Sequence, residues 1–120
     1  MKENLIVEKS YNFAIRIINL YKFLTNEKKE YVVSKQILKS GTSIGANINE
    51  SQSAESKMDF VHKLSISAKE ARETDYWLKL LKDTNFIDIK MFDSISKDCK
   101  EILRIINSII LTSKENKKEK

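Results

Sequence analysis

Proline is absent from this sequence of 120 residues, and only two glycines, one cysteine, one histidine and one tryptophan are present. Without proline, and with glycine this rare, almost nothing in the chain would interrupt a helix. Cys99 is alone, which excludes a disulfide within the chain and fits a reducing compartment. Asp59 and His62 have the spacing of an acid-x-x-His motif, but one histidine leaves too few ligands for an intrachain di-metal site. We therefore expect a helical protein without a metal or another cofactor.

Long apolar runs are missing too, because no stretch approaches the roughly 18 uninterrupted apolar residues of a membrane-spanning helix. The first residues combine Lys2, Glu3 and Glu8 with a short apolar run, without the apolar core and cleavage site of a signal peptide. We expect a cytoplasmic protein with no membrane partner. With 41% apolar and 32% charged residues, a chain of this length can bury a core of its own in one domain.

Apolar residues recur at helical spacing in four stretches that are separated by polar breaks. We predict helices from about Glu3 or Glu8 to Leu24, from about Glu30 to Asn49 or Ser53, from about Lys57 to Lys82, and from about Asp88 to Thr112. Ser56 and Asp59 fit a cap at the start of the third helix. The pattern predicts an all-α, up-down-up-down four-helix bundle over residues 1–113, followed by a frayed polar tail over residues 114–120. A heptad coiled coil is the structural alternative.

Both glycines, Gly41 and Gly45, lie inside the second predicted helix. A glycine within a helix costs about 1 kcal/mol relative to alanine, so two in adjacent turns indicate that a neighbouring element approaches closely. No strand precedes them and no Gly-Lys-Ser/Thr follows, which argues against a phosphate-binding loop. The middle of the third predicted helix carries unusually small side chains. We expect the glycines to face these small residues, such as Ser67, Ala68 or Ala71.

The first predicted helix is apolar around far more than the roughly 100° stripe that a surface helix buries. The fourth helix is similarly broad between Ile102 and Leu111. A lone bundle would leave this apolar surface exposed, which soluble monomers usually avoid. We therefore predict a homo-oligomer.

Few residues suggest chemistry. Glu70 and Glu73 could act as an acid–base pair, but ion pairs on a helix surface are the simpler interpretation, and no nucleophile is evident. Cys99 lies on an apolar stripe, which is typical of a small buried side chain. Tyr76 and Trp77 could stack on bases, although packing or a subunit contact is the more common use of an indole. We do not expect an enzyme.

Positive charge is concentrated in one segment. Residues 9–49 carry seven cations and two acids, Glu27 and Glu30. The net charge of this segment is therefore +5, the same as that of the whole chain. Neutralisation of phosphates needs several cations on one face, and nothing here would specify a base sequence. The candidate nucleic-acid-binding residues are Lys9, Arg16, Lys22, Lys35 and Lys39. The alternative is an ordinary solvated face whose charge is incidental.

Two stretches carry a family resemblance, Ser34–Ile48 (SKQILKSGTSIGANI) and Phe60–Leu78 (FVHKLSISAKEARETDYWL). They resemble the bacterial four-helix-bundle proteins first noticed as reading frames in intervening sequences of 23S ribosomal RNA genes. Asn49 stands where that family more often shows alanine, a small departure that leaves the fold unthreatened. The resemblance implies a homopentamer. The related accessory variability determinant of diversity-generating retroelements is a pentameric barrel that binds nucleic acid and a reverse transcriptase.

The resemblance therefore also implies a nucleic-acid or ribonucleoprotein role. We expect an oligomeric bundle, with a pentamer as the implied state, that binds RNA or DNA without strong sequence preference. The rival expectation is a protein-interaction scaffold or an accessory subunit, for example of a reverse transcriptase, with no nucleic-acid role of its own.

Overall fold

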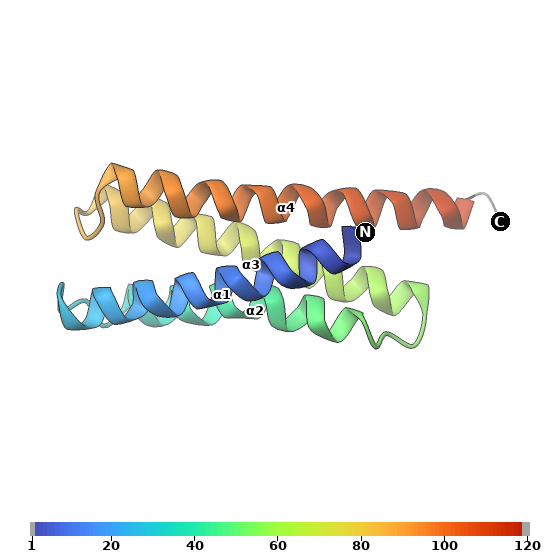
Figure 1. Cartoon of the computed structure of the whole chain (residues 1–120), viewed down its shortest axis with the longest axis horizontal. Coiled ribbons are helices and arrows are strands. Elements are labelled where there is room, and N and C mark those ends of the chain that lie inside the picture. Colours follow the sequence, from blue (N-terminus) through green and yellow to red (C-terminus); the bar gives the residue numbers. More distant parts are fainter. Residues whose placement is uncertain (1, 119–120) are drawn as a thin grey trace.

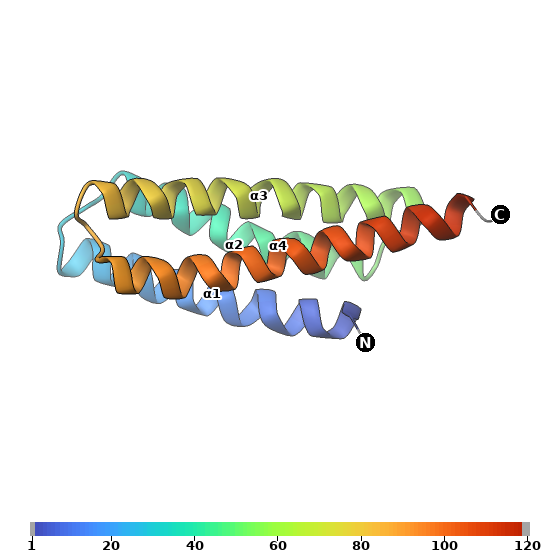
Figure 2. The same cartoon turned by 90° about the horizontal axis from the view of Figure 1, so that it is seen from above.

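Four helices make up nearly all of the computed structural model, which describes residues 2–118. They are α1 (Lys2–Asn26), α2 (Val33–Ser51), α3 (Lys57–Asp83) and α4 (Ile89–Lys118). Consecutive helices run antiparallel in a bundle of 53 × 22 × 20 Å (Figure 1). Each helix packs against two neighbours, and α4 completes the bundle beside α3 and α1 (Figure 2). The predicted all-α, up-down-up-down four-helix bundle is confirmed.

The helix boundaries lie close to the predicted ones except at two ends. α2 begins at Val33 and not at Glu30, while α4 continues past Thr112 to Lys118. Lysine and glutamate are good helix formers, so the predicted tail is helical as far as the structure describes it. Residues 119–120 of that tail, and Met1 of the predicted bundle, lie outside the described residues. Within residues 2–118, no helix combines the length and apolar character needed to cross a membrane.

The core is formed by residues that recur at alternating spacings of three and four along each helix. On α1 these positions are all buried: Ile6, Ser10, Phe13, Ile17, Leu20 and Leu24. On α4 the same pattern buries Cys99, whose Sγ donates a hydrogen bond to Ala71 O at 3.2 Å. Burial raises the pKa of the Cys99 thiol to about 12. The prediction of a small buried side chain at this position is confirmed.

Hydroxyl groups join α2 to α3 inside the bundle. Ser67 Oγ donates to Ile44 O at 2.8 Å, and Thr74 Oγ1 donates to Ser40 Oγ at 2.9 Å. Every buried polar side-chain atom of the described residues has a hydrogen-bond partner, so these groups cost the core little. Small hydroxyl residues therefore allow α2 and α3 to lie close together.

The two glycines lie inside α2, as predicted, but they face α1. A Cβ added at Gly41 would lie 2.7 Å from Ile17 Cγ1, and one added at Gly45 would lie 3.1 Å from Ser10 O. The prediction that they face Ser67, Ala68 or Ala71 of α3 was wrong. The side of α2 that meets α3 carries Ser40 and Ile44 instead, which contact Thr74 and Ser67, because one position along a helix turns a side chain by about 100°.

Replacing Gly41 by alanine should destabilise the protein, even though alanine favours a helix by about 1 kcal/mol. The new Cβ would overlap the fully buried Ile17, and overpacking of a tight core typically costs ~1–3 kcal/mol. Gly45→Leu should destabilise as well, because it meets backbone at Ser10. Denaturant unfolding measures both effects. Gln36→Ala, at an exposed position of α2, is the control and should be nearly neutral. A Gly41→Ala variant more stable than the parent would refute the close approach.

Side chains cap the starts of α2, α3 and α4; at α4, Met91 N donates to Asp88 Oδ1 at 2.8 Å. Ser56 caps α3 as predicted, since Asp59 N donates to Ser56 Oγ at 3.0 Å. At the start of α2, the Glu30 carboxylate accepts hydrogen bonds from the backbone N–H groups of Ser34, Val33 and Val32 at 2.6, 3.0 and 3.1 Å. Partial burial alone would raise the pKa of Glu30, but these donors hold it below its ordinary value. Glu30 therefore ends the connection and does not join the helix.

Glu30→Ala should lower the unfolding free energy at neutral pH by about 1 kcal/mol, the usual cost of losing a cap. Because folding lowers this pKa, the contribution of Glu30 is complete above the ordinary value of 4.5 and is lost as the pH falls through the folded-state pKa. The gap in melting temperature between parent and variant should therefore narrow below that pH. Glu27→Ala, at an exposed acid of the same connection, should open no such gap. If the difference in melting temperature between the parent and Glu30→Ala did not depend on pH, the capping role of the Glu30 carboxylate would be contradicted.

Candidate nucleic-acid interface

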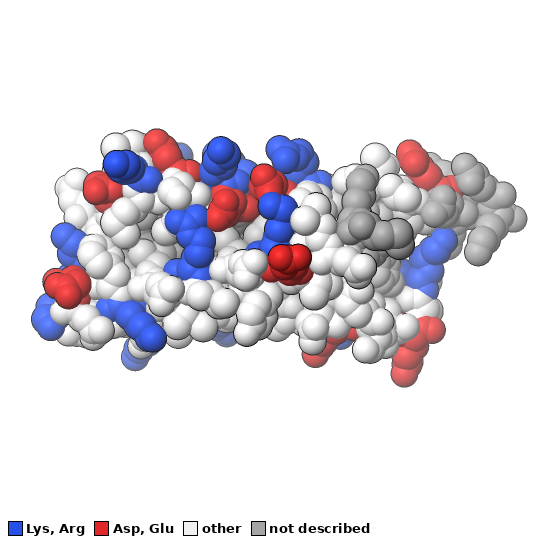
Figure 3. All heavy atoms as spheres, viewed as in Figure 1, with Lys and Arg blue, Asp and Glu red and all other residues white. Residues whose placement is uncertain are grey.

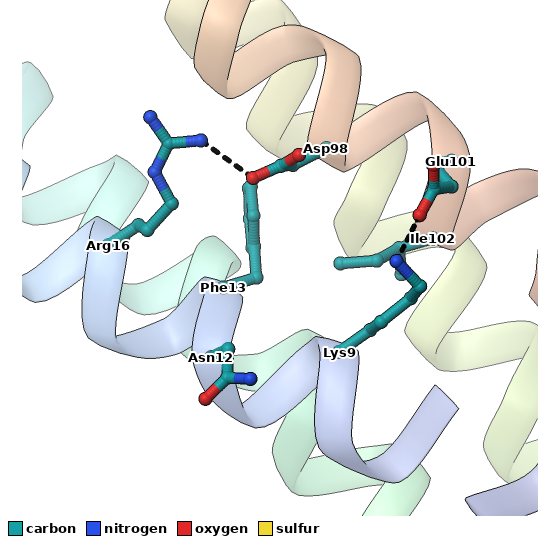
Figure 4. Close-up of a pocket in the computed structure, with 7 residues that line it drawn as sticks. All are labelled: Lys9, Asn12, Phe13, Arg16, Asp98, Glu101 and Ile102. Carbon is teal, nitrogen blue, oxygen red and sulfur yellow. Dashed lines mark hydrogen bonds and ion pairs between the residues drawn. The ribbon is translucent and has the colours of Figure 1, made fainter. Parts of the chain in front are cut away.

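Lys9 and Arg16 project from α1 toward α4, where each meets a carboxylate (Figure 4). Lys9 Nζ forms an ion pair with Glu101, and Arg16 Nη1 donates to Asp98 Oδ2 at 2.6 Å. Arg16 also donates through Nη2 to Ser94 Oγ at 2.9 Å. The four charged side chains border a pocket of about 200 Å³ together with Asn12, Phe13 and Ile102. Two of the five predicted phosphate-binding cations are thus already engaged within the bundle.

The pairing acts on both members of the Lys9–Glu101 ion pair. The shared hydrogen bond raises the pKa of Lys9 and lowers the pKa of Glu101, so both charges are retained at neutral pH. Figure 3 shows blue and red side chains next to each other along this seam between α1 and α4. A phosphate could bind here only by displacing the carboxylates. Exposed ion pairs of this kind contribute little to stability.

Lys22, Lys35 and Lys39 are exposed and form no ion pair with residues 4–115, whose side chains the structure describes. Lys35 and Lys39 lie on adjacent turns of one side of α2. Within α2 the first acid is Glu50, near the end of the helix, and it is paired with Lys63 of α3 at 3.3 Å. Within α2 the two cations therefore have no acid between them, while Glu70 of α3 is near enough for the charge of Lys39 to oppose the rise in the pKa of Glu70.

The five predicted residues do not form one patch. Lys9 and Arg16 turn toward α4, whereas Lys35 and Lys39 lie on α2, which packs against another side of α1. The charge count grouped them because they are close in sequence. Only Lys22, Lys35 and Lys39 remain as exposed cations of the predicted set.

Counting net charge by sequence segment missed a second group of exposed cations, which lie on α3 and α4. These are Lys69, Arg72 and Lys79 on α3, and Lys97, Lys100 and Arg104 on α4. Residues 50–120 contain almost as many acids as cations, which made this half look neutral. Two acids of α4, Asp98 and Glu101, are paired with α1, whereas the exposed Asp93 lines the same pocket as Lys97 and Lys100. The helical spacing of these cations could have revealed the group in the sequence, but a count of net charge over the whole segment conceals that spacing.

The carboxylates considered for chemistry have structural contacts. Glu73 Oε1 accepts a hydrogen bond from Trp77 Nε1 at 3.4 Å. Burial raises the pKa of Glu70, and the charge of Glu73 raises it further. Among the described residues, no group of three or more His, Cys, Asp or Glu side chains could hold a metal ion.

Apolar surface remains on α1, as the breadth of its apolar pattern predicted. Tyr11, Ile15 and Ile18 are 68%, 45% and 40% exposed. A mainly apolar groove of about 480 Å³ lies between α1 and α2, and its lining includes Val7, Tyr11, Ala14, Gly45 and Ala46. The face of the bundle that carries α1 shows a broad area with few charges (Figure 3). On α4, Leu111 is exposed, whereas Ile102, Ile106 and Ile109 are buried.

The arrangement of four antiparallel helices agrees with the result of a family comparison. The model of the family described as 23S rRNA-intervening sequence protein matches residues 2–108. The chain belongs to this family. The match covers α1, α2 and α3 completely and most of α4, so the predicted resemblance is confirmed.

A solved structure supports the same membership in the 23S rRNA-intervening sequence family. It is the crystal structure of a protein of unknown function from the S23 ribosomal protein family of Bacteroides thetaiotaomicron VPI-5482. The two chains are 56% identical, with a TM-score of 0.91, over 92% of this chain and 98% of the other. No curated protein matches the chain. The family description names a place in ribosomal RNA genes and no activity, so function has to be argued from the surfaces.

Proposed function

We propose that this 23S rRNA-intervening sequence protein is an oligomeric bundle that binds RNA or DNA, without strong sequence preference, through its basic surface. The observation that carries the proposal is the pair Lys35 and Lys39, exposed on a stretch of α2 without an acid. Cations of this kind release counterions from a phosphate backbone, which drives non-specific binding. They position a nucleic acid without reading its bases.

The predicted residues contribute unequally in this proposal. Lys22, Lys35 and Lys39 meet phosphates directly. Lys9 and Arg16 contribute less, because a phosphate has to compete with Glu101 and Asp98 for them. The proposed interface is therefore centred on α2 and not on the seam between α1 and α4.

Assembly supports binding in this proposal. The exposed apolar side chains of α1 and the groove beside them favour a contact between subunits. A homopentamer is the state that the family resemblance implies. A ring of subunits would repeat each pair of lysines, and repetition raises the overall affinity without a strong single site.

The second candidate function is a protein-interaction scaffold or accessory subunit, for example of a reverse transcriptase. The same apolar groove between α1 and α2 favours it. In that case the partner covers the groove and the positive charge of α2 is incidental.

Replacing Lys35 and Lys39 together by glutamate should weaken binding to nucleic acid at least roughly tenfold at low salt, because two phosphate contacts are lost and two repulsions are added. Titration of labelled RNA and DNA at two salt concentrations measures it. Parental affinity should fall steeply with salt and vary little between unrelated sequences of equal length. A Lys117→Glu, Lys118→Glu variant has the same change in net charge at the other end of the chain and serves as the control.

The outcomes of this titration separate the candidates. Unchanged affinity in the Lys35, Lys39 variant would remove the interface from α2. Loss in the control alone would make the end of α4 the binding element. If no nucleic acid binds even at low salt, the scaffold function is favoured.

Replacing Ile15 and Ile18 by aspartate should dissociate the oligomer, since it puts two charges into the exposed apolar surface of α1. Light scattering at micromolar concentration measures the mass. Asn12→Asp, Asn19→Asp adds the same charge at exposed positions of the same helix, and this control should keep the parental mass. A parent that elutes as the 14.0 kDa monomer would disprove assembly.

A further inference from the structure

The outer face of α3 carries a regular line of exposed residues. Positions spaced by three and four along it are all exposed: Met58, His62, Ser65, Lys69, Arg72, Tyr76, Lys79 and Asp83. Residues at this spacing lie along one face of a helix. Between Met58 and Lys79 this line contains three cations and an aromatic ring but no acid.

Three acids of α3 have contacts of their own, and a fourth, Glu70, is near enough to Lys69 for the charge of that lysine to oppose the rise in the pKa of Glu70. Glu73 accepts a hydrogen bond from Trp77 Nε1, and Asp75 accepts one from Ser96 Oγ of α4 at 2.7 Å. Asp83, at the end of the line, lies 3.5 Å from Lys82 Nζ. The exposed cations Lys69, Arg72 and Lys79 form no ion pair with a described residue. The exposed face of α3 is thus more positive than the sequence of the helix suggests.

Tyr76 stands in the middle of these cations and is 60% exposed. Its ring packs edge-on against Trp77, with ring centroids 5.1 Å apart and an interplanar angle of 71°. Trp77 is half-buried against the core and is held by Glu73. A large ring that is exposed but held by its neighbour loses little conformational freedom when another flat group packs on it.

We propose that the outer face of α3 is a stacking site for single-stranded nucleic acid, in which Tyr76 takes an unpaired base and Lys69, Arg72 and Lys79 contact the flanking phosphates. The proposal rests on the proposed nucleic-acid binding but places a separate site on another helix. Aromatic rings stack on any base, and cations beside them follow the backbone, which is the combination that sequence-tolerant single-strand binding uses. In a duplex the bases are already stacked, so a duplex gains only the phosphate contacts.

The neighbouring helix extends the positive surface. Ala71 and Cys99 are in contact across the bundle, so Arg72 and Lys100, the next residues on each helix, lie at the same level. Lys97 and Arg104 are exposed on either side of Lys100 along α4. From Lys69 to Lys79 the site on α3 extends about 15 Å, at 1.5 Å per residue, which suits a few nucleotides.

The test compares single-stranded and duplex probes of the same length. In the parent, labelled oligouridylate should bind more tightly than a duplex, and its binding should change the fluorescence of Trp77, the one tryptophan of the chain. Tyr76→Ala should weaken binding of the single strand roughly tenfold, in line with about 1–3 kcal/mol for stacking on one base. Its affinity for the duplex should stay at the parental value.

Two further variants make this result specific. Tyr76→Phe keeps the ring and should retain the parental affinity for the single strand. Tyr31→Ala removes another exposed tyrosine, in the connection between α1 and α2, and it should also bind as the parent does. Circular dichroism confirms that each variant is folded.

Three results would overturn the stacking site. If Tyr76→Ala binds oligouridylate like the parent while Lys35→Glu, Lys39→Glu does not, binding through α2 is retained and the site on α3 is refuted. If Tyr76→Ala changes the mass in light scattering, the ring belongs to a subunit contact. If the parent binds neither the single strand nor the duplex at low salt, both the site and the proposed function fail.

Discussion

The bundle depends on the close packing of α2 between its two neighbours. On one side, Gly41 and Gly45 leave room for Ile17 and the backbone of α1. On the other side, hydroxyl groups of α3 form hydrogen bonds to α2, as Ser67 does to Ile44 O. Both contacts require small residues, because a larger side chain would separate the helices. The position of α2 then determines which side of α1 is buried and which side keeps its apolar residues exposed.

Ion pairing between α1 and α4 redistributes the charge of the protein. Lys9 and Arg16 take up Glu101 and Asp98, so the segment with the highest net charge is partly neutralised. On α4, Glu101 pairs with Lys9 but also feels the charges of Lys97 and Arg104, which help to lower its pKa, and both of these cations stay exposed. Binding to a polyanion depends on charges that are exposed and unpaired. The surfaces that matter for the proposed function therefore differ from the segments with the largest charge count.

Apolar and basic surfaces lie on different parts of the bundle. Tyr11, Ile15 and Ile18 form the apolar part on α1, whereas Lys39 of α2 and Arg72 of α3 belong to basic parts. In the proposed function, the apolar side chains of α1 join subunits while the cations of α2 and α3 meet a nucleic acid. Under that proposal, apolar burial would stabilise the assembly and repeated charge would strengthen the binding. An oligomer and a binding function are thus compatible in one small fold.

The sequence by itself determined the four helices, the buried Cys99 and the surplus apolar surface of α1. Each of these follows from periodicity within one helix or from the absence of residues that break helices. Tertiary structure alone decided which helix the glycines face and which cations are paired. α2 packs against both α1 and α3, but Gly41 faces only α1, and Lys9 meets its acid through a contact with Glu101 of α4. Such choices depend on the rotation of each helix against its neighbours, and a pattern along one helix carries no information about that rotation.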